Sequence, residues 1–245
     1  MSRERLDELR KSVLFRMVIQ PLAKAAPSYG HQPGLRAQAW DSRGIVGVEA
    51  IASKLRSGGF VAVENALSPQ LRARLDERCR ASATAGFTPA AVGRSERRTH
   101  DAGIRGDVIR WLDHAMATDC SFLTVMEDLR IGLNEQLYLG LFKYECHYAI
   151  YGVGAHYDRH LDTLSGEKNR LLSTVVYLHD KWAPADGGEL LLYRAGNQSA
   201  IARILPKPGL MVLFLSEEFP HEVLSAKRPR HSIAGWFRGR DASHP

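Results

Sequence analysis

The stretch GAHYDRHLD, residues 154–162, contains two overlapping His-X-Asp triplets, His156-Tyr157-Asp158 and His160-Leu161-Asp162. A further histidine, His221, follows the apolar run GLMVLFL, and Arg230 comes nine residues after it. Two histidines and one carboxylate on a rigid scaffold form the facial triad that holds non-haem Fe(II) and leaves coordination positions open. A nearby arginine can pair in bidentate fashion with a co-substrate that carries a carboxylate. The order of these residues therefore predicts an iron site of this kind.

The residues alone leave open which triplet supplies the ligands. Side chains alternate along a strand, so residues 156, 158, 160 and 162 would share one strand face, and geometry does not exclude the earlier pair. Asp162, however, adjoins the polar loop TLSGEKN, where a strand end can project a carboxylate onto an open site. This favours His160 and Asp162, with His156 and Asp158 beside the site or at its entrance. A lone His-X-Asp also occurs by chance, and His221 by itself could be a structural histidine.

Size and composition indicate a globular protein with one sizeable domain. The chain has 245 residues, of which 44% are hydrophobic and 24% charged, enough for a substantial core. The three cysteines show neither a zinc-binding spacing nor a disulfide framework, which favours a reducing cytoplasm. No secretory signal and no apolar run of membrane-spanning length is visible. The net charge of +6 is dispersed along the chain, so neither nucleic acid nor a membrane is an expected partner. The oligomeric state stays open.

The first part of the chain is predicted to be an extension. An apolar stripe indicates an amphipathic helix over residues 3–20, whose members are Leu6, Leu9, Val13 and Met17. Residues 21–43 are rich in Pro, Gly and Gln without periodicity, which is typical of a linker or an irregular wrap. We therefore expect an N-terminal extension over residues 1–46 and the main domain over residues 47–245.

Several helices open the main domain. Gly58-Gly59 end a predicted helix in VEAIASKLRSGG, and the strand-like run FVAVEN follows. Ser68-Pro69 supply a cap and a first helical residue for the next helix. The chain then becomes loop-like from Gly86 to Gly106. A long helix is predicted over Ser121–Leu137, with an apolar side formed by Phe122, Val125, Met126, Leu129 and Leu133.

After Leu139 the pattern changes to short strands separated by turn residues. The strand-like runs are FKYECHYAIY, RLLSTVVYLH, GELLLYR, GLMVLFL, HEVLSA and HSIAGWFR. Asp186-Gly187-Gly188 and Pro206-Lys207-Pro208-Gly209 are strong turn signals between them. Helices followed by many short strands predict an α+β fold, a double-stranded β-helix (jelly roll) core backed by N-terminal helices.

Three longer segments resemble the prolyl 4-hydroxylase family of 2-oxoglutarate- and Fe(II)-dependent dioxygenases, in particular the bacterial relatives of the oxygen-sensing prolyl hydroxylases. These segments are HYAIYGVGAHYDRHLD, RLLSTVVYLHDKWAPADGGELLLY and FPHEVLSAKRPRHSIAGWF. The resemblance covers roughly residues 48 to 240, and the first 45 residues have no counterpart in it. The family pattern Tyr-X-Arg-His-Leu-Asp places the metal pair at His160 and Asp162.

The resemblance also implies roles for individual residues. His160, Asp162 and His221 would hold iron. Arg230 would form the salt bridge to the distal carboxylate of 2-oxoglutarate, helped by Tyr177, and Tyr151 would line the same pocket. Expected substrate contacts are Tyr157, Trp236 and the segment Arg105-Gly106-Asp107 with Trp111, which resembles the end of a mobile loop over a prolyl substrate. The flexible, basic stretch GRSERRTHDAG before it suits such a lid. For the aromatics, ordinary core packing is an equal alternative; for the segment, the alternative is a solvated turn with a local salt bridge.

The function that the resemblance implies is hydroxylation of a prolyl residue at C4 in a protein, with O2 consumed and succinate and CO2 released. Ascorbate binding is implied as well, and elongation factor Tu is a candidate substrate. His156, which stands where the bacterial pattern commonly has an aromatic residue, and the unmatched extension leave the substrate open. One alternative is a hydroxylase of a free amino acid or another small molecule. From another class comes a non-catalytic metal-binding interaction module. A nucleic-acid demethylase of the same superfamily is a third alternative, and the sequence lacks the clustered basic groove with stacking aromatics that it would need.

Overall fold

In the computed structural model, residues 33–245 form one compact unit. All the residues that the structure describes belong to this unit. The described residues are 35–36, 47–81, 86–90, 101, 103–163 and 169–240. The predicted helix over residues 3–20 and most of the predicted lid loop lie outside them. So does the predicted linker, apart from the two-residue strand β1 (Leu35–Arg36). The predicted boundary after residue 46 stays a prediction.

The first two helices begin and end where their sequence signals place them. Helix α2 (Val48–Gly58) is followed by Gly59, whose φ of 76° is in the left-handed region that glycine tolerates. The Gly59 N–H donates a hydrogen bond to the Leu55 carbonyl. Helix α3 (Pro69–Ala81) is capped by Ser68, whose hydroxyl oxygen accepts a hydrogen bond from the Leu71 N–H at 3.2 Å. The cap and stop residues predicted for these helices are confirmed.

Helix α4 (Ala117–Leu137) begins earlier than the predicted Ser121. Its apolar periodicity starts only at Phe122, so the first turn carries no apolar signal. That turn is held instead by Asp119, which is fully buried and accepts hydrogen bonds from the Arg78 guanidinium at 2.6 and 3.0 Å. The Tyr148 hydroxyl and the Asp113 N–H donate to the same carboxylate at 2.6 and 2.9 Å. Asp119 therefore ties α4 to α3 and to the sheet.

Replacing Asp119 by alanine is expected to lower the free energy of unfolding by about 3 kcal/mol, because Arg78 and Tyr148 lose their shared partner. Although burial opposes ionisation, the hydrogen bonds from Arg78, Asp113 and Tyr148 lower the pKa of Asp119. Its contribution is therefore fully present above the unfolded-state pKa of about 3.9, and it is lost as the pH falls below that value and through the lower pKa of the folded state. Urea unfolding at neutral and acid pH should show the difference from wild type shrink in acid.

Glu127→Ala is the matched control on the same helix. Glu127 forms an exposed pair with Arg130, and such pairs contribute at most about 1 kcal/mol. If the Asp119 and Glu127 variants lost equal stability, Asp119 would not anchor α4 as described.

The strands form two sheets. The large sheet has the order β1-β2-β10-β7-β12-β5-β4-β3, and the small sheet has the order β6-β11-β8-β9. The large sheet contains, besides β1, the strands β2 (Phe60–Glu64), β3 (Thr88–Pro89), β4 (Asp107–Trp111), β5 (Lys143–Tyr151), β7 (Arg170–Tyr177), β10 (Met211–Leu215) and β12 (Arg230–Arg238). The small sheet contains β6 (Tyr157–His160), β8 (Leu190–Leu192), β9 (Ala202–Ile204) and β11 (His221–Val223). Apart from the β1–β2 pair, the strands pair antiparallel, which is consistent with the predicted jelly-roll class.

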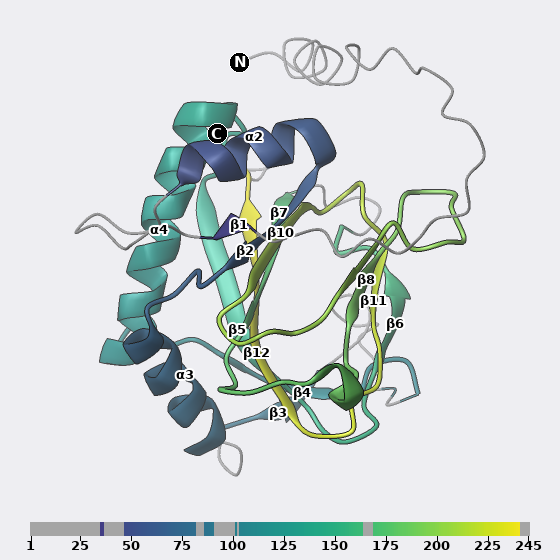
Figure 1. Ribbon diagram of the computed structural model, residues 1–245. Coiled ribbons are helices and arrows are strands. Elements are labelled where there is room, and N and C mark those ends of the chain that lie inside the picture. The colour runs from purple at the N-terminus through teal and green to yellow at the C-terminus, as the bar shows by residue number, and fades with distance from the viewer. Residues whose placement is uncertain are drawn as a thin grey trace. The chain divides into compact units, whose positions relative to one another are not determined.

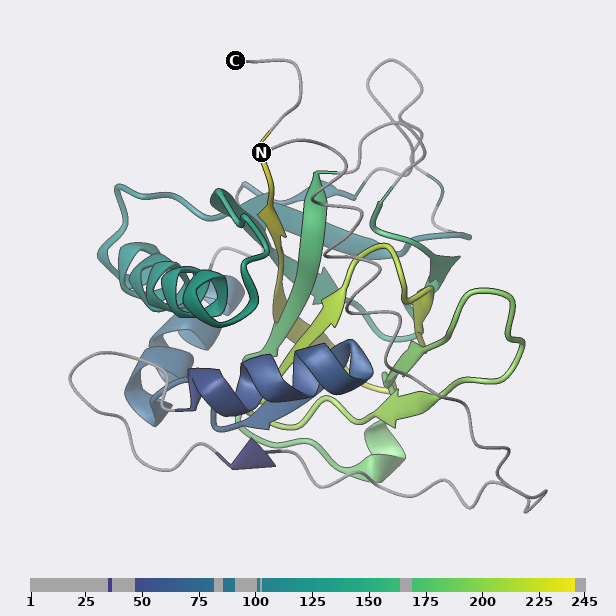
Figure 2. The same ribbon diagram turned by 90° about the horizontal axis from the view of Figure 1, so that it is seen from above.

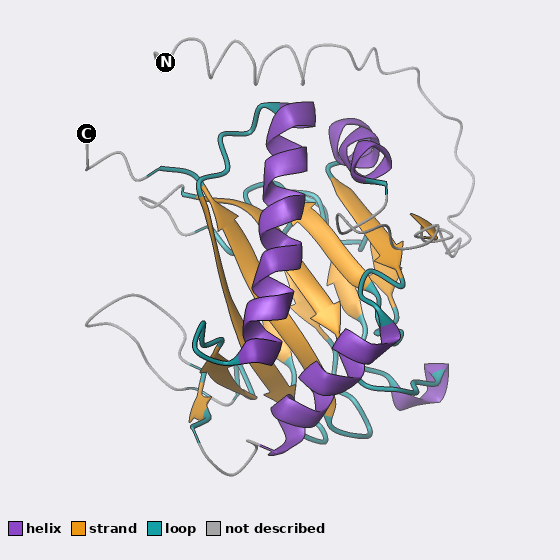
Figure 3. Cartoon of the chain, turned by 90° about the vertical axis from the view of Figure 1, so that its left-hand side faces the viewer, coloured by secondary structure: helices purple, strands orange, loops and turns teal. Residues whose placement is uncertain are grey.

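The helices and the small sheet lie on opposite faces of the large sheet (Figures 1, 2 and 3). One apolar cluster joins the helices to the sheet strands, with Ile51, Leu75, Phe122, Leu129, Leu172, Val176 and Phe237 among its members. A second cluster lies between the two sheets and includes Tyr151, Tyr177, Val212, Phe214, Leu190, Leu192 and Val223. Alternation along each strand of the large sheet thus directs one side-chain row to the helices and the other to the small sheet. Among the described helices, none is both long and apolar enough to cross a membrane.

Candidate metal and co-substrate site

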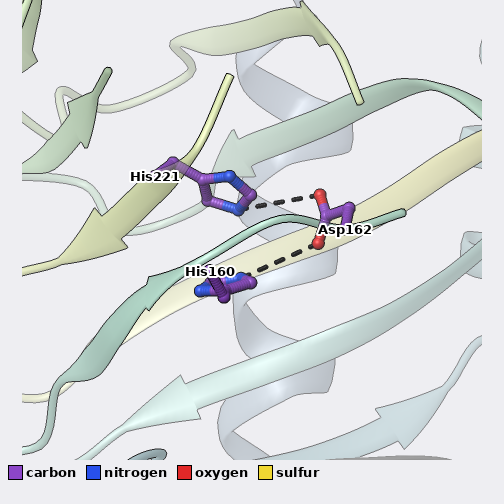
Figure 4. A group of neighbouring side chains, drawn as sticks. All are labelled: His160, Asp162 and His221. Atoms are coloured by element: carbon purple, nitrogen blue, oxygen red, sulfur yellow. Dashed lines mark ion pairs between the residues drawn. The ribbon is translucent and has the colours of Figure 1, made fainter. Parts of the chain in front are cut away.

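His160, Asp162 and His221 come together at the junction of β6 and β11 (Figure 4). His160 ends β6 and lies directly opposite His221, the first residue of β11, in their antiparallel pairing. The potential ligand atoms of the three residues all lie within 4.8 Å of one another. The Nε2 atom of His160 is 3.7 Å from Asp162 Oδ1, and that of His221 is 3.6 Å from Oδ2. Within the described part of the chain, this is the group of such residues that could hold a metal ion.

Both imidazoles are oriented by carbonyl groups two residues before them. The Nδ1 atom of His160 is 2.7 Å from the Asp158 carbonyl oxygen, and that of His221 is 3.0 Å from the Phe219 carbonyl oxygen. A carbonyl only accepts hydrogen bonds, so each Nδ1 carries the proton. Each Nε2 is then left with its lone pair directed at the space beside Asp162. This is the tautomer that a metal ligand needs.

The protonation states of the group also suit a cation. Burial and the neighbouring His221 lower the pKa of His160 and keep it neutral. Although burial opposes ionisation of Asp162, the two imidazoles and the hydrogen bond from Ser173 lower its pKa. A neutral imidazole, as in His160, and an ionised carboxylate, as in Asp162, are the states in which these side chains bind metals. The donor set therefore fits an iron ion.

The earlier triplet does not join the group. The His156 side chain is exposed, and its Nε2 lies 3.1 Å from the Gly103 carbonyl oxygen and 3.4 Å from Asp158 Oδ1. The expectation that residues 156, 158, 160 and 162 share one strand face is wrong, because β6 spans only Tyr157–His160. Asp162 lies beyond the strand in a bend, and this bend lets its carboxylate face His221.

A second polar group lies between the two sheets, at the start of β12. Arg230 is buried, and its Nη1 donates to the Gly188 carbonyl at 2.9 Å, but its Nε has no hydrogen-bond partner. Its guanidinium lies over the ring of Tyr151, 4.2 Å from the centroid, and 5.6 Å from that of Tyr177. The buried hydroxyl of Tyr177 also lacks a partner. Burial is the main factor that raises the pKa values of both tyrosines, so both stay protonated and Tyr177 can donate.

This arrangement is incomplete without an anion. No carboxylate of a described residue forms an ion pair with Arg230. A buried guanidinium without a counter-charge and a buried hydroxyl without a partner each cost free energy. A carboxylate placed between Arg230 and Tyr177 would accept hydrogen bonds from both. The structure thus brings together the three residues expected at the co-substrate, and their chemistry fits one end of a dicarboxylate.

The segment expected to contact substrate runs beside the metal-bearing strand. Arg105 pairs with Tyr157 as an isolated β-bridge, and its guanidinium lies 4.6 Å from the centroid of that ring. The Tyr157 ring in turn stacks on His160 at 3.6 Å. Arg105 also forms a bidentate ion pair with Asp107 at 2.6 and 3.0 Å. The local salt bridge of the alternative interpretation is therefore present, but the pair is largely buried, so the turn is not a solvated one. A contact between this segment and substrate stays a prediction.

Gly106 permits the close approach of this segment to β6. A Cβ atom on Gly106 would lie 3.0 Å from the Ala155 Cβ, closer than most Cβ atoms pack, so the neighbouring chain would have to shift. The Gly106 N–H donates to the His156 carbonyl at 2.9 Å, and the Asp158 N–H donates to the Ile104 carbonyl at 2.8 Å. The segment is therefore hydrogen-bonded to β6 on both sides of Arg105.

The remaining expected substrate residue, Trp236, lies on the same face of the large sheet as Arg230. It is opposite Ser173 of β7 in register, and the Arg170 guanidinium covers its ring at 3.6 Å. Next to it lies His147, which sequence reasoning missed: it is buried between Trp236 and the half-exposed Trp111, and its Nδ1 has no partner. Only strand register, which the sequence pattern does not reveal, places His147 here.

Comparison with known proteins agrees with this chemistry. The family model of the 2OG-Fe(II) oxygenase superfamily matches residues 146–238, which include every residue of the metal and co-substrate groups. A prolyl-4-hydroxylase from Pseudomonas putida is 37% identical, with a TM-score of 0.71, and the match covers 80% of this chain and 100% of that one. The chain belongs to the prolyl 4-hydroxylase family of Fe(II)- and 2-oxoglutarate-dependent dioxygenases. It is therefore a dioxygenase that uses Fe(II), 2-oxoglutarate and O2.

Two further relatives lie in the same family. A prolyl hydroxylase from Trichoplax adhaerens, solved with a peptide fragment of the oxygen degradation domain of hypoxia inducible factor, is 25% identical with a TM-score of 0.66. That match covers 78% of this chain and 88% of the relative. The hypoxia-inducible factor prolyl hydroxylase of Caenorhabditis elegans is 35% identical over 92 residues, which are 36% of this chain and 12% of the length of that protein.

Proposed function

We propose that this dioxygenase hydroxylates a prolyl residue at C4 in a protein or peptide and releases succinate and CO2. His160, Asp162 and His221 would hold the iron. Arg230 and Tyr177 would hold the distal carboxylate of 2-oxoglutarate, and Tyr151 would line the same pocket. The observation that carries this proposal is the unpartnered Arg230 Nε and Tyr177 hydroxyl, which lie between the large sheet and the small sheet that carries both histidines of the triad. When bound, iron activates O2 for oxidative decarboxylation of the 2-oxo acid and for hydroxylation.

The protein supplies position and charge. The two carbonyl-oriented imidazoles and Asp162 hold the iron at the edge of the small sheet. Arg230 and Tyr177 neutralise and orient one end of the co-substrate. The Arg105–Asp107 pair fixes the Tyr157 ring against His160, which gives the site a rigid aromatic wall. A rigid wall can present one C–H bond of the substrate in a fixed place.

The prolyl substrate is supported by the relatives. The Pseudomonas putida protein is a prolyl-4-hydroxylase, and the Trichoplax adhaerens protein carries a peptide fragment in its structure. The half-exposed Trp111 on β4, next to the Arg105 segment, suits contact with a peptide rather than with a small enclosed molecule. Elongation factor Tu remains our candidate protein, and the free thiols of Cys79, Cys120 and Cys146 suit the cytoplasm.

The first experiment is anaerobic titration of Fe(II) and 2-oxoglutarate into the apo-protein. The weak visible charge-transfer band of the iron chelate should develop. The loaded enzyme is then incubated separately with purified elongation factor Tu, a prolyl peptide library and free proline. Mass spectrometry shows which of them gains the mass of one oxygen atom. If only free proline gained oxygen, the protein would be a small-molecule hydroxylase and our proposal would be wrong. A folded protein without the band would favour a non-catalytic binding module.

A further inference from the structure

Two buried hydroxyl groups extend from the metal group into the large sheet. Ser173, on β7, is 1% exposed, and its Oγ lies 2.6 Å from Asp162 Oδ2. Ser216 follows β10, is fully buried, and its Oγ lies 2.8 Å from the Oγ of Ser173. The pairing of β10 with β7 fixes this contact, because the Ser216 N–H donates to the Leu171 carbonyl at 3.1 Å. Neither serine has a role in the function proposed above.

The number of available protons determines which hydroxyl donates in each of the two hydrogen bonds. An ionised Asp162 only accepts hydrogen bonds, so the single hydroxyl proton of Ser173 is donated to Oδ2. Ser173 then has only lone pairs to offer Ser216. The Ser216 hydroxyl must therefore donate to Ser173. Hydrogen bonds in such a chain polarise one another, so Ser216 strengthens the bond from Ser173 to Asp162.

These hydrogen bonds make the two carboxylate oxygens of Asp162 unequal, because Ser173 donates to Oδ2. The imidazoles do not, because Oδ1 is 3.7 Å from one Nε2 and Oδ2 is 3.6 Å from the other. A carboxylate can bind a cation through one oxygen or through both. If Asp162 used both, it would occupy a coordination position that the facial triad must leave open for the co-substrate and O2.

We propose that Ser216 and Ser173 form a directed hydrogen-bond chain that engages Asp162 Oδ2, so that Asp162 binds the iron through Oδ1 alone. Ser173 and Ser216 are thus positioning residues that set metal affinity and keep a coordination position open. This inference rests on the proposed assignment of His160, Asp162 and His221 as iron ligands. The test below separates a failure of that assignment from a failure of the inference.

The test uses Co(II) in place of Fe(II), with affinity measured by calorimetry and coordination by visible absorption. Ser173→Ala should weaken Co(II) binding about 10- to 100-fold, the usual cost of losing a group that orients a metal ligand. Its spectrum should also shift, because the freed Oδ2 can bind the metal. Ser173→Thr, which keeps the hydroxyl, should have the Co(II) affinity and the visible spectrum of wild type. Ser216→Ala should weaken binding by a smaller factor, because Ser173 keeps its bond to Asp162.

Thr174→Val is the matched control. The Thr174 hydroxyl is equally buried on the next residue of β7, but it points to the other face and contacts the Tyr144 hydroxyl at 2.7 Å. Its loss should lower stability without changing Co(II) affinity or spectrum. Wild-type affinity and spectrum in Ser173→Ala would overturn the inference, and wild-type affinity in Ser216→Ala would remove Ser216 from it. If His221→Ala bound Co(II) as tightly as wild type, the ligand assignment itself would be wrong.

Discussion

Replacing His221 or Asp162 by alanine is expected to abolish both Fe(II) binding and 2-oxoglutarate turnover. Each substitution removes one of three ligand atoms that lie within 4.8 Å of one another. Loss of a group that only orients a ligand already costs up to about 100-fold in affinity, so loss of the ligand itself should exceed that. Fe(II) affinity measured anaerobically and succinate release under air would report the two effects.

Asp158→Ala is the matched control, because it removes the carboxylate of the other triplet. The Asp158 side chain is exposed and lies 3.4 Å from His156, away from the triad. Its backbone carbonyl, which orients His160, is retained in the variant. Iron affinity and turnover should therefore change only a few-fold. Loss of iron binding in Asp158→Ala, with binding retained in Asp162→Ala, would show that the earlier triplet carries the metal.

Much of this fold could be predicted because its signals are local. Short strand-like runs between turn residues predicted β5, β7, β10 and β12. The Gly58-Gly59 stop predicted the end of α2, and the Ser68-Pro69 cap predicted the start of α3. Strand β4 gave no such signal, because its buried residue Asp107 is polar and forms an ion pair with Arg105. The start of α4 was missed for the same reason, since Asp119 is held by partners distant in sequence. Elements fixed by buried ion pairs therefore carry no hydrophobic pattern that could reveal them.

Some residues of the candidate site could likewise be predicted from the sequence, and others could not. Motif spacing pointed to the triad and Arg230, and the resemblance to the family pointed to the aromatic residues. The structure brings His160, Asp162 and His221 together. The bend that carries Asp162 past the end of β6 could not be predicted, because strand alternation does not say where a strand stops. Ser173, Ser216 and His147 had no signal either. They are ordinary strand or turn residues, and only the pairing of strands distant in sequence brings them to the site.

Arg230→Met is expected to raise the KM for 2-oxoglutarate by at least about 30-fold while Fe(II) still binds. Removing one partner of a buried, hydrogen-bonded charge pair costs about 2–5 kcal/mol, and about 1.4 kcal/mol corresponds to tenfold. Tyr177→Phe should have a smaller effect in the same direction, because it deletes one neutral donor. Steady-state kinetics with varied 2-oxoglutarate and a separate Fe(II) titration would distinguish the two ligands.

The stability of the apo-protein is a second measurement of the role of Arg230. The substitution should weaken co-substrate binding but should not destabilise the apo-protein. A buried guanidinium whose Nε has no partner lowers stability until an anion binds. Arg230→Met should therefore leave the apo-protein as stable as wild type or more so, and should remove the stabilisation that 2-oxoglutarate gives to wild type. Arg228→Met is the matched control, because Arg228 is exposed and only 3.8 Å from Asp186. An unchanged KM in Arg230→Met would instead move the co-substrate role to Lys227 or Arg228, the neighbouring cations on this segment.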